Sequence, residues 1–394
     1  MGRDLPDLDR NMRILLASSS SGSRGGGELY LLYLGRALAQ RGHTVLLWAS
    51  DHPRMDELAN SFSGIGEVVR SPYRNTYDRR GRSISSYLNL RSVGQLAHEW
   101  RKVQPDLLHL NKQNLEDGLD LLHAARRAHL PNICTIHLTQ SAEYLKAKLA
   151  PARDFVARRA LRNYHHPIVT VLENRRRDLV DFIGPSPRIH MIANGVPLYD
   201  LARRAVVREA KRADLGVAKD ELLFIAVGRM VPQKRPLEFL ARAEEVLRRE
   251  PKAKFLWVGD GVLNMAWDDW VTAHGLGKSI RRLPWRNDVP LLLMAADVFL
   301  HVAEYEGLPL AILEAMSAGL PCAISDHLLA EMPFLDASNS ISVAADGAWM
   351  GLLKETQQLQ SIGLAARQLV EQKYSYGKMA EAYEAVYREE LSQP

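Results

Sequence analysis

Two glutamates in the C-terminal half have a spacing and a sequence context that could serve chemistry. Glu306 and Glu314 lie eight positions apart in EYEGLPLAILEAMSAGLP, residues 304–321. Gly307 permits a tight turn after the first glutamate, and a proline two residues later suits the first turn of a helix. A helix is therefore predicted over 309–318, with Glu306 on the loop before it and Glu314 inside its second turn.

The start of that helix has the features of an anion site. The free amides of Gly307, Leu308 and Leu310 are expected to point at a bound anion, with the helix dipole behind them. This arrangement suits a diphosphate. Because the carboxylate of Glu314 could hydrogen-bond vicinal hydroxyls such as those of a ribose, the whole stretch favours a sugar nucleotide as ligand.

Two cations follow an apolar run at 222–227. Arg229 and Lys234 lie in GRMVPQK, residues 228–234, directly after that run. Cations fixed at the end of a strand could neutralise the charge that develops on a departing diphosphate, because arginine offers a rigid fork and lysine a movable point charge. No Asp-x-Asp motif ends a predicted strand, so we expect no metal site and no cofactor besides the nucleotide-sugar substrate.

The elements that must position these residues begin with an alternation of apolar runs and helical patterns. In the first half, apolar runs occupy 12–18, 43–49, 106–110, 132–137, 168–172 and 189–192, and helical patterns occupy 28–41 and 117–128. Short apolar runs separated by helices are typical of parallel strands buried on both faces. A parallel sheet covered by helices is therefore predicted.

The same alternation resumes after a turn signal, NGVP at 194–197. Apolar runs occupy 222–227, 253–258, 280–283, 298–302 and 321–324, and helical patterns occupy 236–249, 262–274, 289–295 and 309–318. The sequence therefore predicts an α/β protein with two Rossmann-like, doubly wound domains in tandem. Ligands of such sheets bind beyond the carboxyl ends of the strands, so the reaction is expected in the cleft between the domains.

The composition is that of a globular protein with more than one domain. Of 394 residues, 46% are apolar and 25% are charged, which excludes disordered and fibrous classes. Cys134 and Cys322 are too far apart in the sequence for a clustered thiolate site, so a reducing compartment is favoured. Residues 1–11 have no apolar core and are not expected to be a secretory signal, and Asp297 interrupts the longest apolar stretch, 289–303. A cytoplasmic protein is predicted.

Positive charge is concentrated in the first half. Residues 1–195 carry 28 Lys and Arg against 19 Asp and Glu, whereas residues 196–394 carry 23 against 27. A basic amphipathic segment at 146–162 and a predicted mobile basic loop at 70–82 suggest an anionic or lipid-linked acceptor and peripheral membrane contact through this half. A solvated helix face is the alternative. No zinc-finger spacing accompanies the arginines, so nucleic acid is not expected as a partner.

Together these motifs resemble those of a known enzyme family. EGLPLAILEAMSAGLP and GRMVPQK are similar to motifs of the GT-B glycosyltransferases of the large retaining family 4, also called glycosyl transferases group 1. The likeness runs over nearly the whole chain. Further shared features are the glycine loop at 25–28, the NGV at 194–196, the GDG at 259–261 and a tyrosine-rich C-terminal helix.

The resemblance implies the GT-B architecture, in which two Rossmann-like domains face a central cleft. An N-terminal acceptor-binding domain would span 1–194, and a C-terminal helix, 375–394, would cross back onto it. A nucleotide-sugar-binding domain would span 195–374. The implied activity is retaining, metal-independent transfer of a hexosyl group from a UDP- or GDP-sugar to an acceptor hydroxyl, in glycan, glycolipid or secondary-metabolite biosynthesis.

The resemblance also assigns roles to individual residues. The implied catalytic residues are His137 near the anomeric carbon, Arg229 and Lys234 on the diphosphate, and Glu306 on the sugar hydroxyls. The implied donor-binding residues are Gly26, Gly27, Gly228, Gly259, Trp285, Arg286, Gly307, Leu308, Leu310 and Glu314, with Trp285 and Arg286 in the loop that lines the base pocket in the family.

Two positions depart from the family pattern. Pro309 replaces a common glycine, which removes one amide donor, and Leu138 follows His137 where an aspartate is frequent. Retention by double displacement would need a carboxylate nucleophile beneath the sugar, and none is identifiable. Front-face substitution is therefore expected, with Arg229, Lys234 and the helix start stabilising the leaving diphosphate.

Two other functions stay open on the sequence alone. A nicotinamide-dependent dehydrogenase or epimerase would bind a ribose through Asp51, although the glycines at 22–27 do not form a G-x-G-x-x-G fingerprint. A non-catalytic nucleotide-sugar-binding subunit would keep the fold, although the joint presence of four charged site residues argues against lost activity.

Overall fold

The chain forms two compact units, seen in a computed structural model that describes residues 11–22, 25–344 and 347–393. The first unit runs up to Gly195 and includes the chain from Tyr376 onward, and the second is Val196–Ser375. These limits lie one residue beyond the predicted positions 194 and 374. Residues 1–10, which make up most of the segment predicted not to be a secretory signal, lie outside the described residues.

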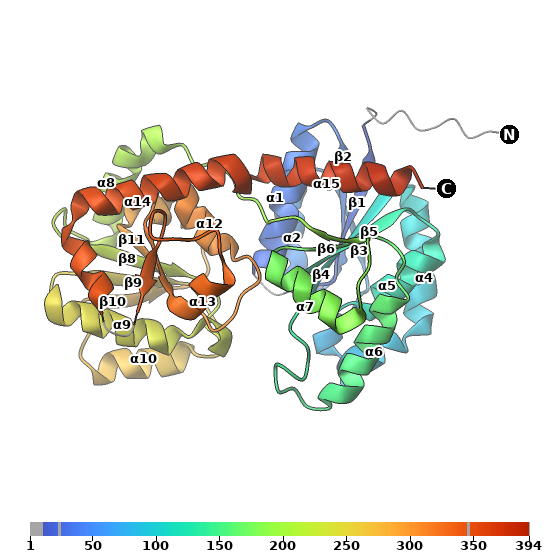
Figure 1. The fold of residues 1–394 in the computed structure, drawn as a ribbon, viewed down its shortest axis with the longest axis horizontal. Helices are drawn as coiled ribbons and strands as arrows, with labels where there is room; N and C mark the ends of the chain where they lie inside the picture. Colours follow the sequence, from blue (N-terminus) through green and yellow to red (C-terminus); the bar gives the residue numbers. More distant parts are fainter. Residues whose placement is uncertain (1–10, 23–24, 345–346, 394) are drawn as a thin grey trace. The chain divides into compact units, whose positions relative to one another are not determined.

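The first unit contains a parallel sheet of seven strands in the order β3-β2-β1-β4-β5-β6-β7. The strands are β1 (Arg13–Ser18), β2 (Thr44–Ser50), β3 (Glu67–Ser71), β4 (Leu107–Asn114), β5 (Asn132–Leu138), β6 (Ile168–Thr170) and β7 (Ile189–Met191). The helices are α1 (Gly26–Gln40), α2 (Asp56–Phe62), α3 (Arg82–Tyr87), α4 (Leu90–Val103), α5 (Leu119–Ala128), α6 (Ala150–Arg162), α7 (Glu173–Ile183) and α15 (Tyr376–Leu391), with the 3₁₀ turns η1 (Pro53–Met55) and η2 (Thr76–Asp78). Figure 1 shows helices on both faces of this sheet.

The second unit contains a parallel sheet of six strands in the order β10-β9-β8-β11-β12-β13. The strands are β8 (Leu223–Val227), β9 (Lys254–Val258), β10 (Ile280–Leu283), β11 (Val298–His301), β12 (Cys322–Ser325) and β13 (Ile341–Val343). The helices are α8 (Arg204–Leu215), α9 (Pro236–Arg249), α10 (Asn264–Ala273), α11 (Val289–Ala295), α12 (Leu310–Ser317), α13 (Asp326–Glu331) and α14 (Thr356–Leu369). The remaining turns are η3 (Leu201–Arg203), η4 (Pro232–Lys234), η5 (Ala348–Lys354) and the π-helical turn η6 (Val370–Tyr374).

The central strands explain why this architecture could be predicted. Five of the six residues of β1 are buried, because successive side chains enter the two cores on opposite faces of the sheet. Leu15 and Ala17 pack in one core with Trp100 of α4 and Leu121 of α5. The two parallel sheets covered by helices confirm the predicted fold class.

The segment 70–82, predicted to be a mobile basic loop, contains residues of three regular elements as well as irregular turns. Its first residues belong to the edge strand β3, the turn η2 lies at its centre, and α3 begins at its end. Two of its arginines are held by carboxylates: Arg70 contacts Asp56 at 3.0 Å, and Arg79 contacts the buried Asp120 at 2.6 Å. These ion pairs neutralise part of the charge from which an anionic acceptor was predicted, and the mobility of the segment stays a prediction.

The last helix, α15, completes the first unit. Tyr387 places its hydroxyl 2.7 Å from Nδ1 of His109 in β4, and Tyr383 places its hydroxyl 2.8 Å from Oγ1 of Thr135 in β5. All four side chains are buried. Glu384 forms an ion pair with Arg41 at the end of α1. The final residues of the chain therefore contribute polar contacts to the centre of a sheet whose strands lie far earlier in the sequence.

Candidate active site

A partly buried ion pair joins two of the predicted catalytic residues in the second unit. Lys234 ends the turn after β8, and Glu306 follows β11, the neighbour of β8 in the sheet. Because neighbouring parallel strands end at the same edge, Nζ of Lys234 reaches Oε1 of Glu306. His301, the last residue of β11, places Nε2 at 3.0 Å from the same oxygen.

The surroundings keep Glu306 ionised. Burial alone would raise the pKa of Glu306, but the charge of Lys234 and the hydrogen bond with His301 outweigh it, so the pKa falls to about 2. Burial also lowers the pKa of His301 despite the nearby carboxylate. At neutral pH the imidazole is therefore uncharged and donates its Nε2–H to Glu306, while Lys234 supplies the balancing charge.

Hydrogen bonds fasten the two loops that carry this pair. The backbone N–H of Glu304 donates to the carbonyl of Gln233 at 2.8 Å, and the side-chain amide of Gln233 donates to the carbonyl of Tyr305 at 3.0 Å. The loops after β8 and β11 thus hold one another just beside the ion pair. Lys234 and Glu306 are positioned by backbone contacts as well as by their own charges.

The predicted glycines Gly228 and Gly259 bring the loops after β8 and β9 into close contact. Gly259 has φ of +133°, and a Cβ built on it would lie 2.2 Å from the carbonyl oxygen of Gly228. That same oxygen accepts a hydrogen bond from Nε1 of Trp257 at 2.9 Å. Only a glycine fits at position 259, because both the backbone conformation and the space exclude a side chain.

The start of α12 forms next to Glu306. Pro309 is the N-cap residue, with φ of −71° and ψ of 117°, so the helix begins one residue later than predicted. Gly307, Leu308 and Leu310 are buried around this start, and the N–H groups of Gly307 and Leu310 donate to none of the described residues. Glu314 lies one turn further along the helix and is 4% exposed. The unpaired amides and a buried carboxylate are thus arranged along the first turns of α12.

Arg229 differs from Lys234 in its surroundings. It follows β8 by two residues and is exposed, and its guanidinium pairs with no carboxylate in the described part of the chain. Of the two cations predicted to hold a diphosphate, one is therefore engaged by Glu306 and the other faces solvent.

The loop after β10 holds the residues predicted for the base pocket. The backbone N–H of Trp285 donates to Oδ2 of Asp260 at 2.8 Å. Arg286 grips Asp288 through two hydrogen bonds of 2.6 and 2.8 Å, and Lys211 contacts the same carboxylate at 2.9 Å. The guanidinium of Arg286 is therefore fixed at the start of α11.

The remaining predicted site residues belong to the first unit. His137 lies near the end of β5, with Nε2 2.7 Å from Oδ1 of Asn111 in the neighbouring strand β4. The ring of Tyr30 meets the imidazole edge-on, with centroids 4.7 Å apart. Burial lowers the pKa of His137 to about 4, so its imidazole is uncharged at neutral pH.

The glycine loop after β1 approaches the same residues. Gly26 is the exposed first residue of α1, and Gly27 is buried beneath the side chain of Gln113. A Cβ on Gly27 would lie 2.0 Å from Nε2 of Gln113, and the carbonyl of Gly27 accepts a hydrogen bond from Asn111 at 3.3 Å. The loop and the His137 strand are thus connected through Asn111.

The sequence analysis missed two residues of these sites, His301 and Asn111. Both are polar side chains in the carboxyl-terminal half of a strand that begins with apolar residues. A polar residue in that position was the available signal, because the carboxyl edge of a parallel sheet is where ligands bind.

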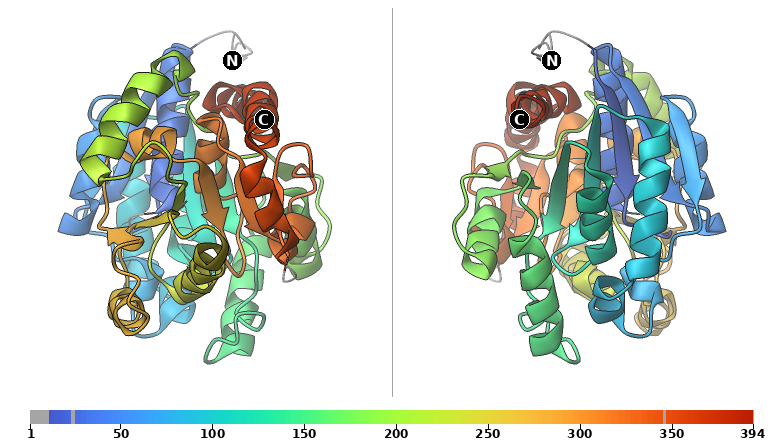
Figure 2. Two further views of the ribbon diagram at one scale, coloured as in Figure 1. Left: turned by 90° about the vertical axis from the view of Figure 1, so that its left-hand side faces the viewer. Right: turned by 90° about the vertical axis from the view of Figure 1, so that its right-hand side faces the viewer.

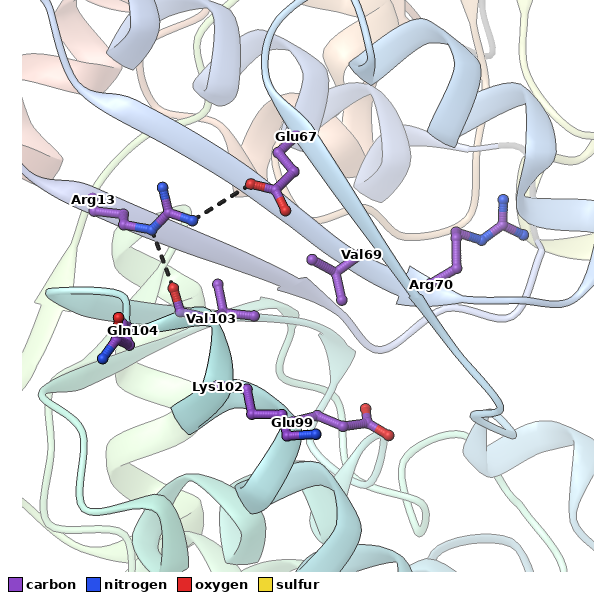
Figure 3. A pocket seen from close by; sticks show the side chains of 8 residues that line it. All are labelled: Arg13, Glu67, Val69, Arg70, Glu99, Lys102, Val103 and Gln104. Carbon is purple, nitrogen blue, oxygen red and sulfur yellow. Dashed lines mark hydrogen bonds and ion pairs between the residues drawn. The ribbon is translucent and has the colours of Figure 1, made fainter.

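The first unit also has a hollow of about 760 Å³ at its opposite edge. Figure 3 shows its lining, in which Arg13 and Glu67, the first residues of β1 and β3, form an ion pair of 3.4 Å. None of the predicted site residues lines it. Across the described ranges, no group of three or more His, Cys, Asp and Glu side chains could hold a metal ion. No helix among the described residues combines the length and the apolar character needed to span a bilayer.

Two family models match successive parts of the chain. The model for Glycosyltransferase Family 4 matches residues 24–199, and that for Glycosyl transferases group 1 matches residues 207–381. Each half of the chain, with its own parallel sheet, thus matches one of the two.

Curated relatives and solved structures agree with these matches. The chain is 31% identical over 258 residues to the UDP-Gal:alpha-D-GlcNAc-diphosphoundecaprenol alpha-1,3-galactosyltransferase of Escherichia coli, a match that spans 62% of this chain and 64% of the relative. It is 25% identical to the D-inositol 3-phosphate glycosyltransferase of Kineococcus radiotolerans, over 95% of this chain and 92% of the relative. Anabaena HepE, solved in complex with UDP and glucose, superposes with a TM-score of 0.74 at 18% identity, over 95% of this chain and 99% of HepE. The fold shared with such solved structures is GT-B.

Proposed function

We propose that this chain, which belongs to the family 4 and group 1 glycosyltransferases, transfers a hexosyl group from a nucleotide-diphosphate sugar to an acceptor hydroxyl. The observation that carries the proposal is the partly buried Lys234–Glu306 pair, which lies beside the N–H groups of Gly307 and Leu310 that donate to none of the described residues. A diphosphate would find a cation, a helix start and two free N–H groups together, which is the chemistry that binds phosphate without a metal ion.

Binding of the donor would change which groups pair with Lys234 and Glu306. The diphosphate takes Lys234 from Glu306, and Arg229, which is already exposed, adds a second cation. Glu306 then accepts hydrogen bonds from sugar hydroxyls while His301 keeps its hydrogen bond to the carboxylate. Glu314 holds the ribose, and the loop of Trp285 and Arg286 lines the base.

Transfer would proceed with retention on the front face of the sugar. Lys234, Arg229 and the start of α12 stabilise the charge that develops on the leaving diphosphate, whose oxygen takes the proton of the acceptor hydroxyl. The C1–O bond to the diphosphate breaks as the bond from C1 to the acceptor oxygen forms. His137 contacts the sugar near the anomeric carbon.

A uridine nucleotide is the donor to test first. The E. coli relative is named for UDP-Gal, and HepE was solved with UDP and glucose. The decisive experiment compares thermal unfolding with UDP-, GDP- and ADP-sugars and then measures slow donor hydrolysis without acceptor. Binding of one donor raises the melting temperature by mass action. Absence of binding and hydrolysis with every donor would refute the proposal, and binding without turnover would identify a non-catalytic subunit.

We also propose that the acceptor is lipid-linked and that the first unit docks on an anionic membrane. The loop before α6 and α6 itself expose large apolar side chains beside lysines. This α6 surface consists of Tyr144, Leu145, Lys146, Lys148, Leu149 and Phe155. Leu149 and Phe155 are 72% and 65% exposed, and Figure 2 shows α6 projecting from its unit. Apolar side chains flanked by cations suit the headgroup region of an anionic bilayer. The acceptor named for the E. coli relative is a diphosphoundecaprenol-linked sugar.

Co-sedimentation with vesicles tests this surface. The chain should bind vesicles rich in anionic lipid at low salt and bind less at high salt, because the lysines are screened. The double variant Leu149→Ser and Phe155→Ser should lose most of the binding. Val206→Ser is the matched control, because this valine of α8 is 75% exposed and lies in the second unit. Equal sedimentation of the double variant and the control would contradict the membrane proposal.

A further inference from the structure

The buried amide of Asn111 lies between the glycine loop and His137. Its Nδ2 is 3.3 Å from the carbonyl oxygen of Gly27, and its Oδ1 is 2.7 Å from Nε2 of His137. Asn111 is 0% exposed and lies in β4, whose register pairs it with Thr135 of the neighbouring strand. One side chain therefore connects the loop after β1 with the end of β5.

The chemistry of these three groups leaves only one arrangement of protons. A peptide carbonyl can only accept, so the –NH₂ of Asn111 must face Gly27. The amide oxygen of Asn111 then faces His137 and can also only accept, so Nε2 of the imidazole must carry the hydrogen. Because burial keeps this imidazole uncharged at neutral pH, its Nδ1 bears a lone pair.

The neighbours of the ring allow it little freedom to leave this arrangement. Tyr30 packs edge-on against the imidazole at an interplanar angle of 79°, and its hydroxyl is 3.4 Å from Oγ1 of Thr135. The side-chain amide of Gln113 lies directly over Gly27, where a Cβ would come within 2.0 Å of its Nε2. The ring is thus held by contacts from α1 and β4.

We infer that Asn111 is a positioning residue that fixes His137 as the Nε2–H tautomer and so makes Nδ1 a hydrogen-bond acceptor. The inference rests on the proposed function, in which His137 contacts the sugar. It adds the chemistry of that contact: a sugar hydroxyl donates its hydrogen to Nδ1. A donor sugar with an ether or a hydrogen in place of that hydroxyl leaves Nδ1 without a partner. A site that hydrogen-bonds a substrate hydroxyl strongly rejects the analogue that lacks it.

Nitrogen NMR of the ligand-free protein tests the inference directly. In protein labelled with ¹⁵N-histidine, the signals of His137 are identified as those lost in His137→Gln. We expect a one-bond proton correlation at Nε2 and none at Nδ1 in the wild type. In Asn111→Leu the two nitrogen shifts should move toward each other, because both tautomers become populated. A proton on Nδ1 in the wild type would overturn the inference, as would unchanged shifts in a folded Asn111→Leu.

A second variant keeps the test decisive if Asn111→Leu does not fold. Asn111→Asp retains an acceptor for Nε2–H but cannot donate to Gly27 while ionised. We expect the proton to stay on Nε2 and the pKa of His137 to rise, because a carboxylate favours the imidazolium. The other groups that face this environment are Tyr30 from α1 and His109 from β4, and both are unchanged in the variant. If the pKa of His137 were the same in Asn111→Asp as in the wild type, the contact between position 111 and His137 would be contradicted.

Kinetics separate positioning from general stability. Asn111→Leu should lower kcat/KM about tenfold or more, on the scale of losing a residue that orients a functional histidine. The same change made in a His137→Gln background should have little further effect, because Asn111 acts through His137. Additive losses in the two backgrounds would overturn the inference. Because the NMR experiment contains no sugar, its outcome is independent of whether the proposed transfer occurs.

Discussion

Replacing Glu306 by glutamine tests whether its pair with Lys234 stabilises the second unit as a charge pair. The pKa of Glu306 is about 2, compared with an ordinary 4.5. At 1.36 kcal/mol for each pH unit, this difference corresponds to about 3 kcal/mol of folding free energy. Because the folded pKa is the lower one, the contribution is complete above pH 4.5 and is lost as the pH falls toward 2.

Urea unfolding monitored by tryptophan fluorescence measures this contribution. At pH 7 Glu306→Gln should lower the free energy of unfolding by about 3 kcal/mol, since a partly buried Lys234 loses its counter-charge. The difference in free energy of unfolding between the variant and the wild type should decrease as the pH falls from 4.5 to 3. Glu304→Gln is the matched control. Its carboxylate is 53% exposed and pairs with Arg235 at 3.5 Å, so its removal should change stability by less than about 1 kcal/mol.

Two results would refute this reasoning. If Glu306→Gln were as stable as Glu304→Gln at pH 7, the carboxylate would not be the charge partner that Lys234 requires. If the difference in free energy of unfolding between Glu306→Gln and the wild type stayed constant down to pH 3, it would arise from packing rather than from ionisation of Glu306.

Three further predictions concern other parts of the chain. Arg229→Ala should lower kcat about 10²-fold with the melting temperature unchanged, because the side chain is exposed, and steady-state kinetics with calorimetry would show both. Gly259→Ala should cost about 2 kcal/mol or more in thermal unfolding, whereas Gly275→Ala, with positive φ but open space, should cost about 1 kcal/mol. Burial raises the pKa of Glu384, but the hydrogen bonds and charges of Arg41 and its other partners outweigh burial, so the net pKa is lowered. Glu384→Gln should therefore lower the free energy of unfolding at pH 7 and have less effect at pH 4, as measured by urea titration.

The fold could be predicted where strands are buried on both faces. The run that became β1 is almost wholly apolar, and β10 and α11 have the bounds that the pattern predicted. The edge strand β3 was missed because it has a neighbour on one side only and contains Glu67 and Arg70 among five residues. Two valines in succession are too short an apolar run to predict a strand, and Arg70 was instead assigned to a basic loop.

The sequence predicted those site residues whose positions follow from the ends of strands, and not the contacts between their side chains. Lys234 and Glu306 follow strands that alternate with helices, so their meeting at one sheet edge follows from topology. That Glu306 would neutralise Lys234 did not follow, since it depends on the distance between two side chains. The tautomer of His137 depends on Asn111 from a different strand, a contact that no spacing in the sequence encodes.

The placement of α15 imposes an order on biosynthesis. The strands of the first sheet leave the ribosome early, but the helix that supplies Tyr383 and Tyr387 to them follows the 180 residues of Val196–Ser375. At about 5–20 residues per second, translation of that insert takes about 10–40 seconds. Throughout this interval the nascent first unit lacks α15. The apolar and polar groups that α15 covers in the folded protein are then exposed. The first unit can therefore complete its core only after the second unit has been synthesised.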